Sequence, residues 1–165
     1  MPFMFFGHSL GAHISFYMAR YLRMHNLPFP THMFVLGSLA PHLPELADSL
    51  NYKMDDKKFI DKLIKMEGMV DEVLNNKDLL DLILPVLRTD IEMLNMMEYT
   101  KDEPLDCSIT SLCGMYDKRV SSKDAEAWNV HTKKDFNIKM IPGKHLFINT
   151  HQDEVINIIN QEVKE

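Results

Sequence analysis

A Gly-x-Ser-x-Gly stretch near the N-terminus constrains the fold of this chain more than any other feature. It runs from Gly7 to Gly11 and follows a short apolar run, Phe3 to Phe6. The residues from Leu10 to about Met24 place apolar side chains at three- and four-residue spacing, which predicts a helix. Glycines on both sides of Ser9 allow a sharp, strained turn. The pattern therefore predicts a buried strand, a turn that presents a serine hydroxyl, and a helix.

Three further apolar runs predict additional strands of the same sheet. The runs are Met33 to Ser38, Ser108 to Gly114 and Phe136 to Ile141. Continuous apolar runs are typical of parallel strands that are buried on both faces. A short helix is expected over Asp124 to His131, and a last helix is expected to begin at Thr150 or His151. The sequence therefore predicts an α/β fold, with a mostly parallel sheet flanked by helices.

The segment from Asp55 to about Asn95 differs in character, because charged residues alternate there with Ile, Leu, Met and Val at helical spacing. We expect three or four short helices, broken near Gly68, at Asn75-Asn76 and at Pro85. A helical insertion at about 50–98, between two strands, predicts a lid over the catalytic edge of the sheet. The alternative is an ordinary helical layer packed on the sheet.

Composition excludes several functional classes. The chain has 165 residues, a net charge of −6 and no cluster of Lys and Arg, which argues against a nucleic-acid partner. No apolar run is long enough for a membrane span, and the opening residues lack the features of a secretory leader. The two cysteines, Cys107 and Cys113, are expected to be free. We therefore expect a cytoplasmic protein.

Three residues in the chain order Ser, Asp, His predict a catalytic triad. Ser9, Asp117 and His145 each follow a predicted strand, so that parallel strands would bring them to one edge of the sheet. A serine hydroxyl needs a neutral imidazole to remove its proton, and a carboxylate holds that imidazole in the required tautomer. The backbone N–H of Leu10, directly after the serine, would be the first oxyanion donor.

Each of these residues also has a structural alternative. Asp117 by itself is compatible with a solvated turn, and His145 with a capping or core histidine; their joint order favours the triad. His8 is expected to pack and orient rather than to act as a base. His8 and His13 do not share a helical face, and the sequence contains no His-Glu-x-x-His, so no metal site is expected.

Five segments of the chain match the motifs of one known family. They are Phe6 to Ala12 at the serine, Ala40 to Pro44, Leu84 to Asp90, Cys113 to Asp117 followed by Trp128, and Pro142 to Phe147 at the histidine. On these segments the chain resembles the type II thioesterases of the α/β-hydrolase superfamily, which accompany fatty-acid, polyketide and non-ribosomal peptide synthases. The similarity spans most of the chain.

The resemblance implies a function. Ser9 would be acylated by a thioester carried on the phosphopantetheine arm of an acyl carrier protein. His145 would act as base and then as acid, Asp117 would orient it, and water would release the free acid. The protein would hold no cofactor of its own, because the pantetheine arrives with the substrate. An apolar groove under a lid would suit an acyl chain.

The chain also departs from the family. Lys144 replaces the usual second glycine before the histidine, and Thr89 replaces an alanine. Members of the family carry further N-terminal strands and a Gly-rich loop that supplies a second oxyanion donor, so the chain resembles an N-terminally truncated member. Loss of one such donor costs about 2.7–4 kcal/mol of transition-state stabilisation. We therefore expect weak activity or low stability from the chain alone. The alternatives are a carboxylesterase or lipase acting on oxygen esters, and a weakly catalytic remnant that binds a partner.

Overall fold

The computed structural model describes residues 1–44 and 50–163. The chain forms two compact units. The sheet unit comprises Met1–Leu43 and Lys101–Glu165, and the helical unit comprises Pro44–Thr100. Each unit has a hydrophobic core of its own.

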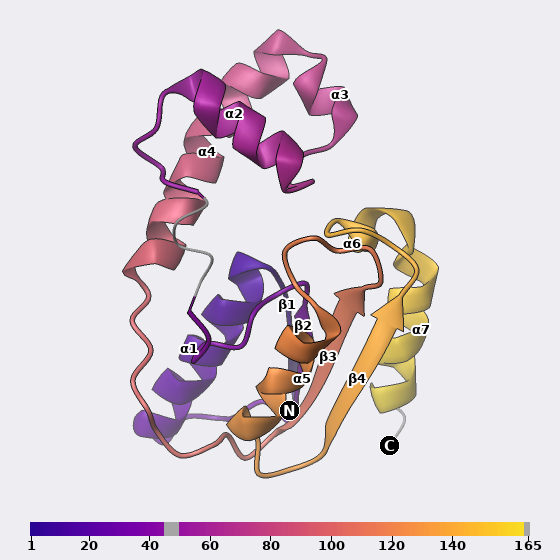
Figure 1. The fold of residues 1–165 in the computed structure, drawn as a ribbon. Coiled ribbons are helices and arrows are strands. Elements are labelled where there is room, and N and C mark those ends of the chain that lie inside the picture. The colour runs from indigo at the N-terminus through magenta and orange to yellow at the C-terminus, as the bar shows by residue number, and fades with distance from the viewer. Residues whose placement is uncertain (45–49, 164–165) are drawn as a thin grey trace. The chain divides into compact units, whose positions relative to one another are not determined.

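The sheet unit is built on four parallel strands in the order β1-β2-β3-β4 (Figure 1). The strands are β1 (Met4–His8), β2 (His32–Leu36), β3 (Ser108–Gly114) and β4 (Phe136–Ile141). In this register Met4 pairs with His32, and His32 pairs with Ser108. All four strands run in one direction, so their carboxyl ends lie at the same edge, where ligands bind in sheets of this kind. The predicted α/β class is confirmed.

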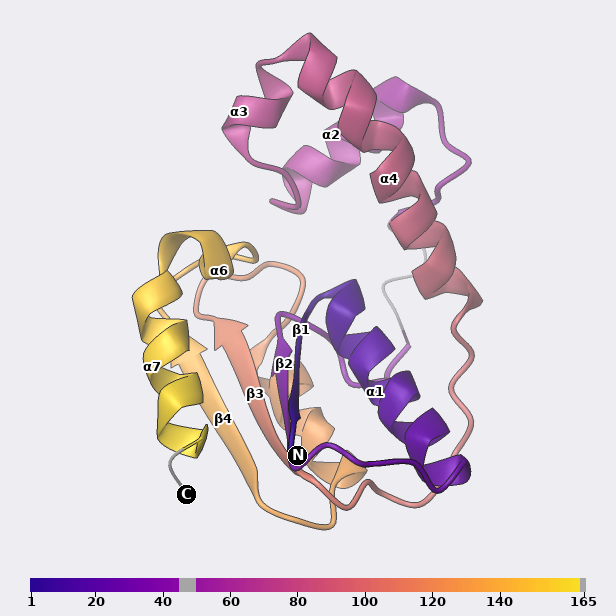
Figure 2. The same cartoon turned by 180° about the vertical axis from the view of Figure 1, so that it is seen from behind.

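Helices cover both faces of this sheet (Figures 1 and 2). One face carries α1 (Leu10–Met24), α5 (Ser122–Glu126) and the 3₁₀ helix η1 (Ala127–His131), and the other carries α6 (Phe147–Thr150) and α7 (Gln152–Val163). Phe34 and Leu36 of β2 pack with Val155 of α7. On the opposite face the buried rings of Phe16 and Trp128 contact each other with centroids 5.9 Å apart.

Most of the predicted elements of the sheet unit are confirmed, with differences at their ends. The strand expected over Met33 to Ser38 runs from His32 to Leu36, and the last helix begins at Gln152 rather than at Thr150 or His151. Strand β1 continues through His8, into the glycine motif. The helix expected over Asp124 to His131 begins at Ser122 and changes to 3₁₀ geometry at Ala127, because a capping box between Ser121 and Asp124 fixes its start. The short helix α6 was not predicted, since four residues carry no periodic signal.

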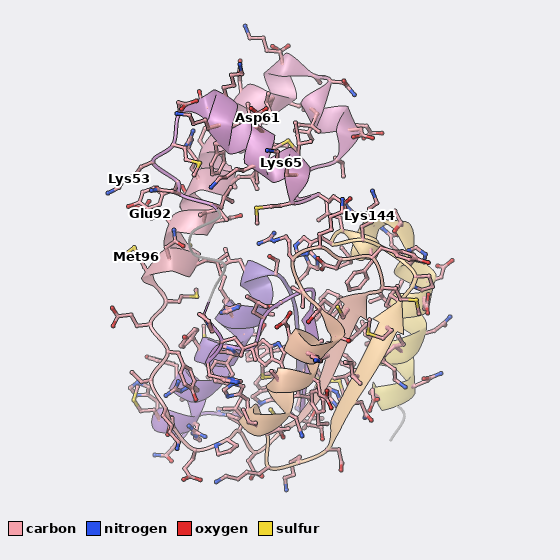
Figure 3. The ribbon with its side chains drawn as sticks, viewed as in Figure 1. Lys53, Asp61, Lys65, Glu92, Met96 and Lys144 are labelled. Carbon is pink, nitrogen blue, oxygen red and sulfur yellow. The ribbon has the colours of Figure 1, made fainter. Side chains whose placement is uncertain are left out.

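The helical unit contains α2 (Asp56–Lys65), α3 (Asp71–Leu74) and α4 (Lys77–Met96). Its core is formed by Leu50, Phe59, Leu63 and Leu84. The breaks expected near Gly68 and at Asn75-Asn76 are confirmed. Side chains such as Asp61, Lys65 and Met96, labelled in Figure 3, are exposed. The role of this unit as a lid stays a prediction.

The expected break at Pro85 is wrong, because α4 continues through it. Proline removes one helical hydrogen bond, which would otherwise reach the carbonyl of Asp81. Asp81 and Pro85 are both exposed, so water can solvate that carbonyl. Leu84 and Leu80 anchor the same stretch in the core of the unit. The burial of Leu80 and Leu84 therefore outweighs the cost of a proline inside a helix, which is about 3 kcal/mol.

Two further expectations concern the whole chain. Cys107 and Cys113 are both buried and free, as predicted. Within residues 1–44 and 50–163, every helix is too short or too polar to span a lipid bilayer.

Candidate active site

Ser9 lies in the turn between β1 and α1. Its backbone has a φ of 52°, a left-handed conformation that is uncommon for a residue other than glycine. The N–H of Ser9 donates to the carbonyl of Leu36 on the neighbouring strand (2.8 Å), which fixes the turn against the sheet. A Cβ at Gly7 would lie 2.2 Å from the carbonyl oxygen of Gly11, so the motif needs a glycine there. The hydroxyl of Ser9 makes no capping bond to α1, although the residue stands at the N-cap position.

Leu10, the predicted oxyanion donor, is the first residue of α1. The first N–H groups of a helix have no acceptor within the helix, and the helix dipole favours negative charge at this end. A developing oxyanion next to Ser9 would therefore meet a backbone donor. Its role as donor stays a prediction.

Asp117 and His145 meet at the same edge of the sheet. His145 follows β4, Asp117 follows β3, and the Nδ1 of the imidazole lies 2.8 Å from Oδ2 of the carboxylate. Both side chains are almost completely buried, with 2% and 0% of their surface exposed. The structure thus brings together two of the three predicted residues.

The carboxylate of Asp117 is held by three groups, of which the imidazole of His145 is one. Its Oδ1 accepts hydrogen bonds from the backbone N–H groups of Arg119 (2.7 Å) and Val120 (3.2 Å). Burial opposes ionisation of Asp117. The hydrogen bond and charge of His145 and these two N–H groups outweigh burial, and they hold the pKa of the carboxyl below its usual value. Asp117 is therefore an anion that is fixed in place.

The second nitrogen of His145 is occupied by an arginine. Nη1 of Arg119 lies 3.1 Å from Nε2. A guanidinium can only donate hydrogen bonds, so Nε2 must be the acceptor and the ring proton must be on Nδ1, facing Asp117. This is the tautomer that a general base needs. Among the described residues, however, the hydroxyl of Ser9 makes no hydrogen bond to His145, and the guanidinium of Arg119 binds Nε2 instead.

His8 and Gly37 complete the surroundings of His145. Nε2 of His8 donates to the backbone carbonyl of His145 (2.9 Å), and burial lowers the pKa of His8 to about 4, against the opposing effect of that bond. Gly37 follows β2 with a φ of 53°, and a Cβ there would lie 3.1 Å from Nε2 of His8 and 3.4 Å from Cε1 of His145. His8 therefore orients the loop that carries His145, and Gly37 leaves room for both rings.

A further close approach seats this loop on β3. A Cβ on Gly114 would lie 2.5 Å from the carbonyl oxygen of Lys144 and 2.6 Å from that of Gly143. The N–H of Tyr116 also donates to the carbonyl of Gly143 (2.9 Å). Glycine at the end of β3 thus allows the histidine loop to contact the aspartate loop directly.

Sequence reasoning missed Gly37 and Arg119. A single glycine directly after a buried strand was a usable signal for Gly37, since such positions often need a positive φ. Nothing in the spacing of Arg119 distinguishes it from a solvated turn residue. Within the described residues, no group of three or more His, Cys, Asp or Glu side chains could hold a metal ion.

A second histidine pair lies on the α1 face of the same unit. Nδ1 of His42, in the loop after β2, lies 2.8 Å from Nε2 of His131 in η1. His131 is buried, and the burial of its ring, together with the charges of His42 and Arg20, lowers its pKa to about 4. The ring of His131 packs against Phe16, with centroids 5.0 Å apart.

The sequence is similar to curated proteins whose names refer to gramicidin. It is 36% identical over 166 residues to "Linear gramicidin dehydrogenase LgrE" of Brevibacillus parabrevis, covering 99% of this chain and 63% of that protein. It is 35% identical over 164 residues to "Gramicidin S biosynthesis protein GrsT" of Aneurinibacillus migulanus, covering 99% of this chain and 64% of that protein. The chain therefore spans less than two thirds of the length of these relatives.

The fold is similar to that of solved thioesterases. RedJ, a thioesterase from the prodiginine biosynthetic pathway in Streptomyces coelicolor, superposes with a TM-score of 0.88 at 30% identity, covering 96% of this chain and 63% of that structure. This similarity confirms an α/β-hydrolase-type sheet. The family model of the thioesterase domain matches residues 1–163. Because that match covers nearly the whole sequence, the chain belongs to the thioesterase domain family.

Proposed function

We propose that the chain is a serine thioesterase, which hydrolyses acyl thioesters with Ser9, His145 and Asp117. The observation that carries this proposal is the buried Asp117–His145 pair, which shares the carboxyl edge of the sheet with Ser9 in its left-handed turn. Membership of the thioesterase family supports the same reaction.

In the first half of the reaction, Nε2 of His145 takes the proton of the Ser9 hydroxyl. The oxygen attacks the thioester carbon, and the negative charge that develops on the carbonyl oxygen is stabilised by the N–H of Leu10. The new O–C bond forms, the C–S bond breaks, and the leaving sulfur takes the proton from Nε2. The products are an acyl-serine and a free thiol.

In the second half, a water molecule replaces the thiol. His145 removes one proton from the water, whose oxygen attacks the acyl carbon, and the ester bond to Ser9 breaks. The proton on Nε2 returns to the serine oxygen, and the carboxylic acid leaves. Throughout, Asp117 stabilises the positive charge that His145 holds in each half-reaction.

We further propose that the acyl group arrives on the phosphopantetheine arm of a carrier protein. LgrE is named for linear gramicidin, GrsT for gramicidin S biosynthesis, and RedJ for the prodiginine biosynthetic pathway. The protein needs no cofactor of its own in this scheme. The name of LgrE includes "dehydrogenase", but this sequence contains no Gly-x-Gly-x-x-Gly fingerprint that would suggest a dinucleotide site.

The test is a comparison of substrates and variants. Wild-type protein, Ser9→Ala and the control Ser15→Ala are assayed on an acyl-pantetheine thioester and on the matched oxygen ester. Ser15 lies in α1, where its hydroxyl donates a hydrogen bond to the carbonyl of Gly11. Ser15→Ala therefore removes a serine hydroxyl from the same helix while Ser9 stays in place. We expect thioester hydrolysis by the wild type and Ser15→Ala, and a loss of about 10³-fold or more in Ser9→Ala.

Two outcomes would contradict the proposal. A strong preference for the oxygen ester would indicate a carboxylesterase or lipase. If a fluorophosphonate probe failed to label Ser9 in folded protein while the protein still bound a carrier protein, the chain would be a binding module.

A further inference from the structure

Strand β1 lies at one edge of the sheet, with backbone groups turned outward. In the part of the chain that the structure describes, β1 pairs with β2 alone. The N–H of Ser9, directly after the strand, donates to the carbonyl of Leu36 and so points towards β2. Backbone groups of alternate residues in a strand point to opposite sides. The N–H and C=O groups of Met4, Phe6 and His8 therefore point away from the sheet.

The two edges of the sheet differ in charge. Edge strands commonly carry charged side chains, which oppose pairing with another chain, and β4 at the far edge has the exposed Lys139. Strand β1 contains no Lys, Arg, Asp or Glu, and burial lowers the pKa of His8 to about 4, so that its ring is neutral at pH 7. The side chain of Phe6 is 44% exposed. Strand β1 thus lacks the protection that β4 has.

The adjoining side of α1 is also uncharged. Phe16 contacts Trp128 of η1, and η1 packs on β3, whereas α1 packs on β1 and β2 (Figure 2). At 100° per residue, the side of α1 turned away from η1 carries Gly11, Ser15, Met18 and Leu22. Met18 is 44% exposed, and a Cβ on Gly11 would meet no atom within 4 Å. Both arginines of α1 bind Asp102 instead.

A second copy of this chain fits the edge, because the outward groups of β1 are complementary to themselves. In an antiparallel pair, residues that face each other can exchange two N–H···O bonds. With Phe6 opposite Phe6 of the second copy, Met4 stands opposite His8, and all three outward residues are paired at once. Any other symmetric register leaves an outward residue opposite a residue outside β1. The two Phe6 side chains would then form a favourable cross-strand pair.

The size of this surface sets the expected strength of association. A standard interface takes about 20–30 residues from each partner, and β1 with the uncharged side of α1 supplies about ten. Because the surface carries no net charge, a second copy meets no like-charge repulsion there. A surface of this size corresponds to a weak dimer, for which we expect a Kd of about 10–100 µM.

We propose that two copies of this chain associate by antiparallel pairing of β1 with β1, centred on Phe6, with α1 packed against α1 of the second copy. The two sheets then form one continuous sheet. This proposal concerns assembly and not the reaction, so it stands or falls independently of the proposed thioesterase activity.

The first test is sedimentation equilibrium of the full chain from about 1 to 300 µM. The proteins are the wild type, Phe6→Lys, Met18→Lys and the control Ile138→Lys, whose side chain is 37% exposed on the opposite edge strand β4. We expect the wild type and Ile138→Lys to dimerise, and Phe6→Lys to weaken the dimer by tenfold or more, because two like charges would face each other. Met18→Lys, on the surface of α1, should weaken it less. Thermal unfolding shows whether each variant is folded.

The second test is disulfide formation, which reports the register. Facing hydrogen-bonded residues have Cα atoms about 5.5 Å apart, within the range of a disulfide. We expect Phe6→Cys to form a covalent dimer under mild oxidation. In this register Phe5 stands opposite Gly7, so the Cα atoms of the two Phe5 positions lie about 8 Å apart and Phe5→Cys should not cross-link. Ile138→Cys is the control on β4, and the native cysteines are buried.

Several results would overturn the proposal. A wild type that stays monomeric at 300 µM would exclude the dimer. If amide hydrogen exchange of Phe6 were already slow in that monomer, the edge would be covered by the chain itself. A dimer that persists in both Phe6→Lys and Met18→Lys would use another surface. Cross-linking of Phe5→Cys in place of Phe6→Cys would contradict the register. Loss of thioesterase activity in a normal dimer would leave the interface intact and remove only the proposed function.

Discussion

Two histidine pairs within the sheet unit show how the partner of an imidazole decides its chemistry. His145 faces the carboxylate of Asp117, and His131 faces the imidazole of His42, each across 2.8 Å. Both His145 and His131 are buried, and both lie beside other aromatic rings. The distances and the burial are therefore alike, and the partners differ.

The difference lies in charge. A carboxylate accepts the Nδ1 proton and can balance the positive charge of a protonated ring, so His145 can take up and release a proton during a reaction. In the His42–His131 pair the partner is a second imidazole, which carries no negative charge to balance a protonated ring. Burial of the His131 ring, with smaller contributions from the charges of His42 and Arg20, lowers its pKa to about 4. The two pairs therefore differ in how well they accommodate a positive charge.

The largest expected effect is the loss of the charge at Asp117. In Asp117→Asn the amide no longer enforces the Nδ1–H tautomer, so we expect kcat for thioester hydrolysis to fall by about 10⁴-fold. His42→Gln, which changes the corresponding partner of His131, should leave kcat unchanged. Steady-state assays and thermal unfolding of both variants check this contrast. Similar losses of kcat in the two variants would remove the distinction between the pairs.

The second effect is acid destabilisation. Burial lowers the pKa of His13 and of His131 to about 4, whereas an unfolded histidine titrates near 6.5. Between these values the unfolded chain binds more protons, so stability is fully present above pH 6.5 and is lost as the pH falls towards 4. Each histidine contributes at most about 3 kcal/mol to this loss.

Urea unfolding at pH 7.5 and pH 4.5 measures this loss. We expect His131→Gln to lose less free energy of unfolding between the two pH values than the wild type. His25→Gln serves as the control, since His25 is exposed at the end of α1. An equal loss in His131→Gln and the wild type would show that His131 is not a source of the acid sensitivity.

The smallest effect concerns His8 and His13, whose side chains bond to backbone carbonyls. His8 bonds His145, and His13 bonds Leu39. A hydrogen bond of this kind is worth about 0.5–1.5 kcal/mol, so His8→Leu should lower kcat by up to about tenfold, and His8→Gln, which keeps a donor, should restore part of it. His13→Leu should lower the melting temperature without changing kcat. A normal kcat in His8→Leu would mean that the bond to His145 does not position the ring.

The strands and the places of the candidate site residues at the strand ends could be predicted because each depends on local pattern. The apolar runs gave strands whose bounds agree for Ser108–Gly114 and Phe136–Ile141, and parallel strands necessarily bring their carboxyl ends together. The pairing of Asp117 with His145 followed from that geometry. For the strands and for the meeting of Asp117 with His145, the local sequence pattern and the sheet topology indicate the same arrangement.

The remaining features depend on contacts that no local pattern encodes. The helix through Pro85 is held by the core of the helical unit, so burial overrides the preference of one residue. Gly37 contacts His8 and His145 only after the strands are side by side. The reach of Arg119 to Nε2 of His145 depends on a side-chain conformation, and sequence spacing carries no information about it.

The strand register has a consequence for the order in which the molecule folds. Pairing of β1 with β2, and of β3 with β4, closes short stretches of chain, whereas the His32–Ser108 pairing of β2 with β3 must close a far longer one. The entropy lost in closing a loop grows with its length, so we expect this central pairing to form last. Ser9 and Gly37 belong to the first half of the sheet, and Asp117 and His145 to the second. Folding intermediates that lack the central pairing would therefore contain two native pairs of parallel strands, with Ser9 separated from Asp117 and His145. We expect reactivity of Ser9 towards a serine probe to appear only in the final kinetic phase.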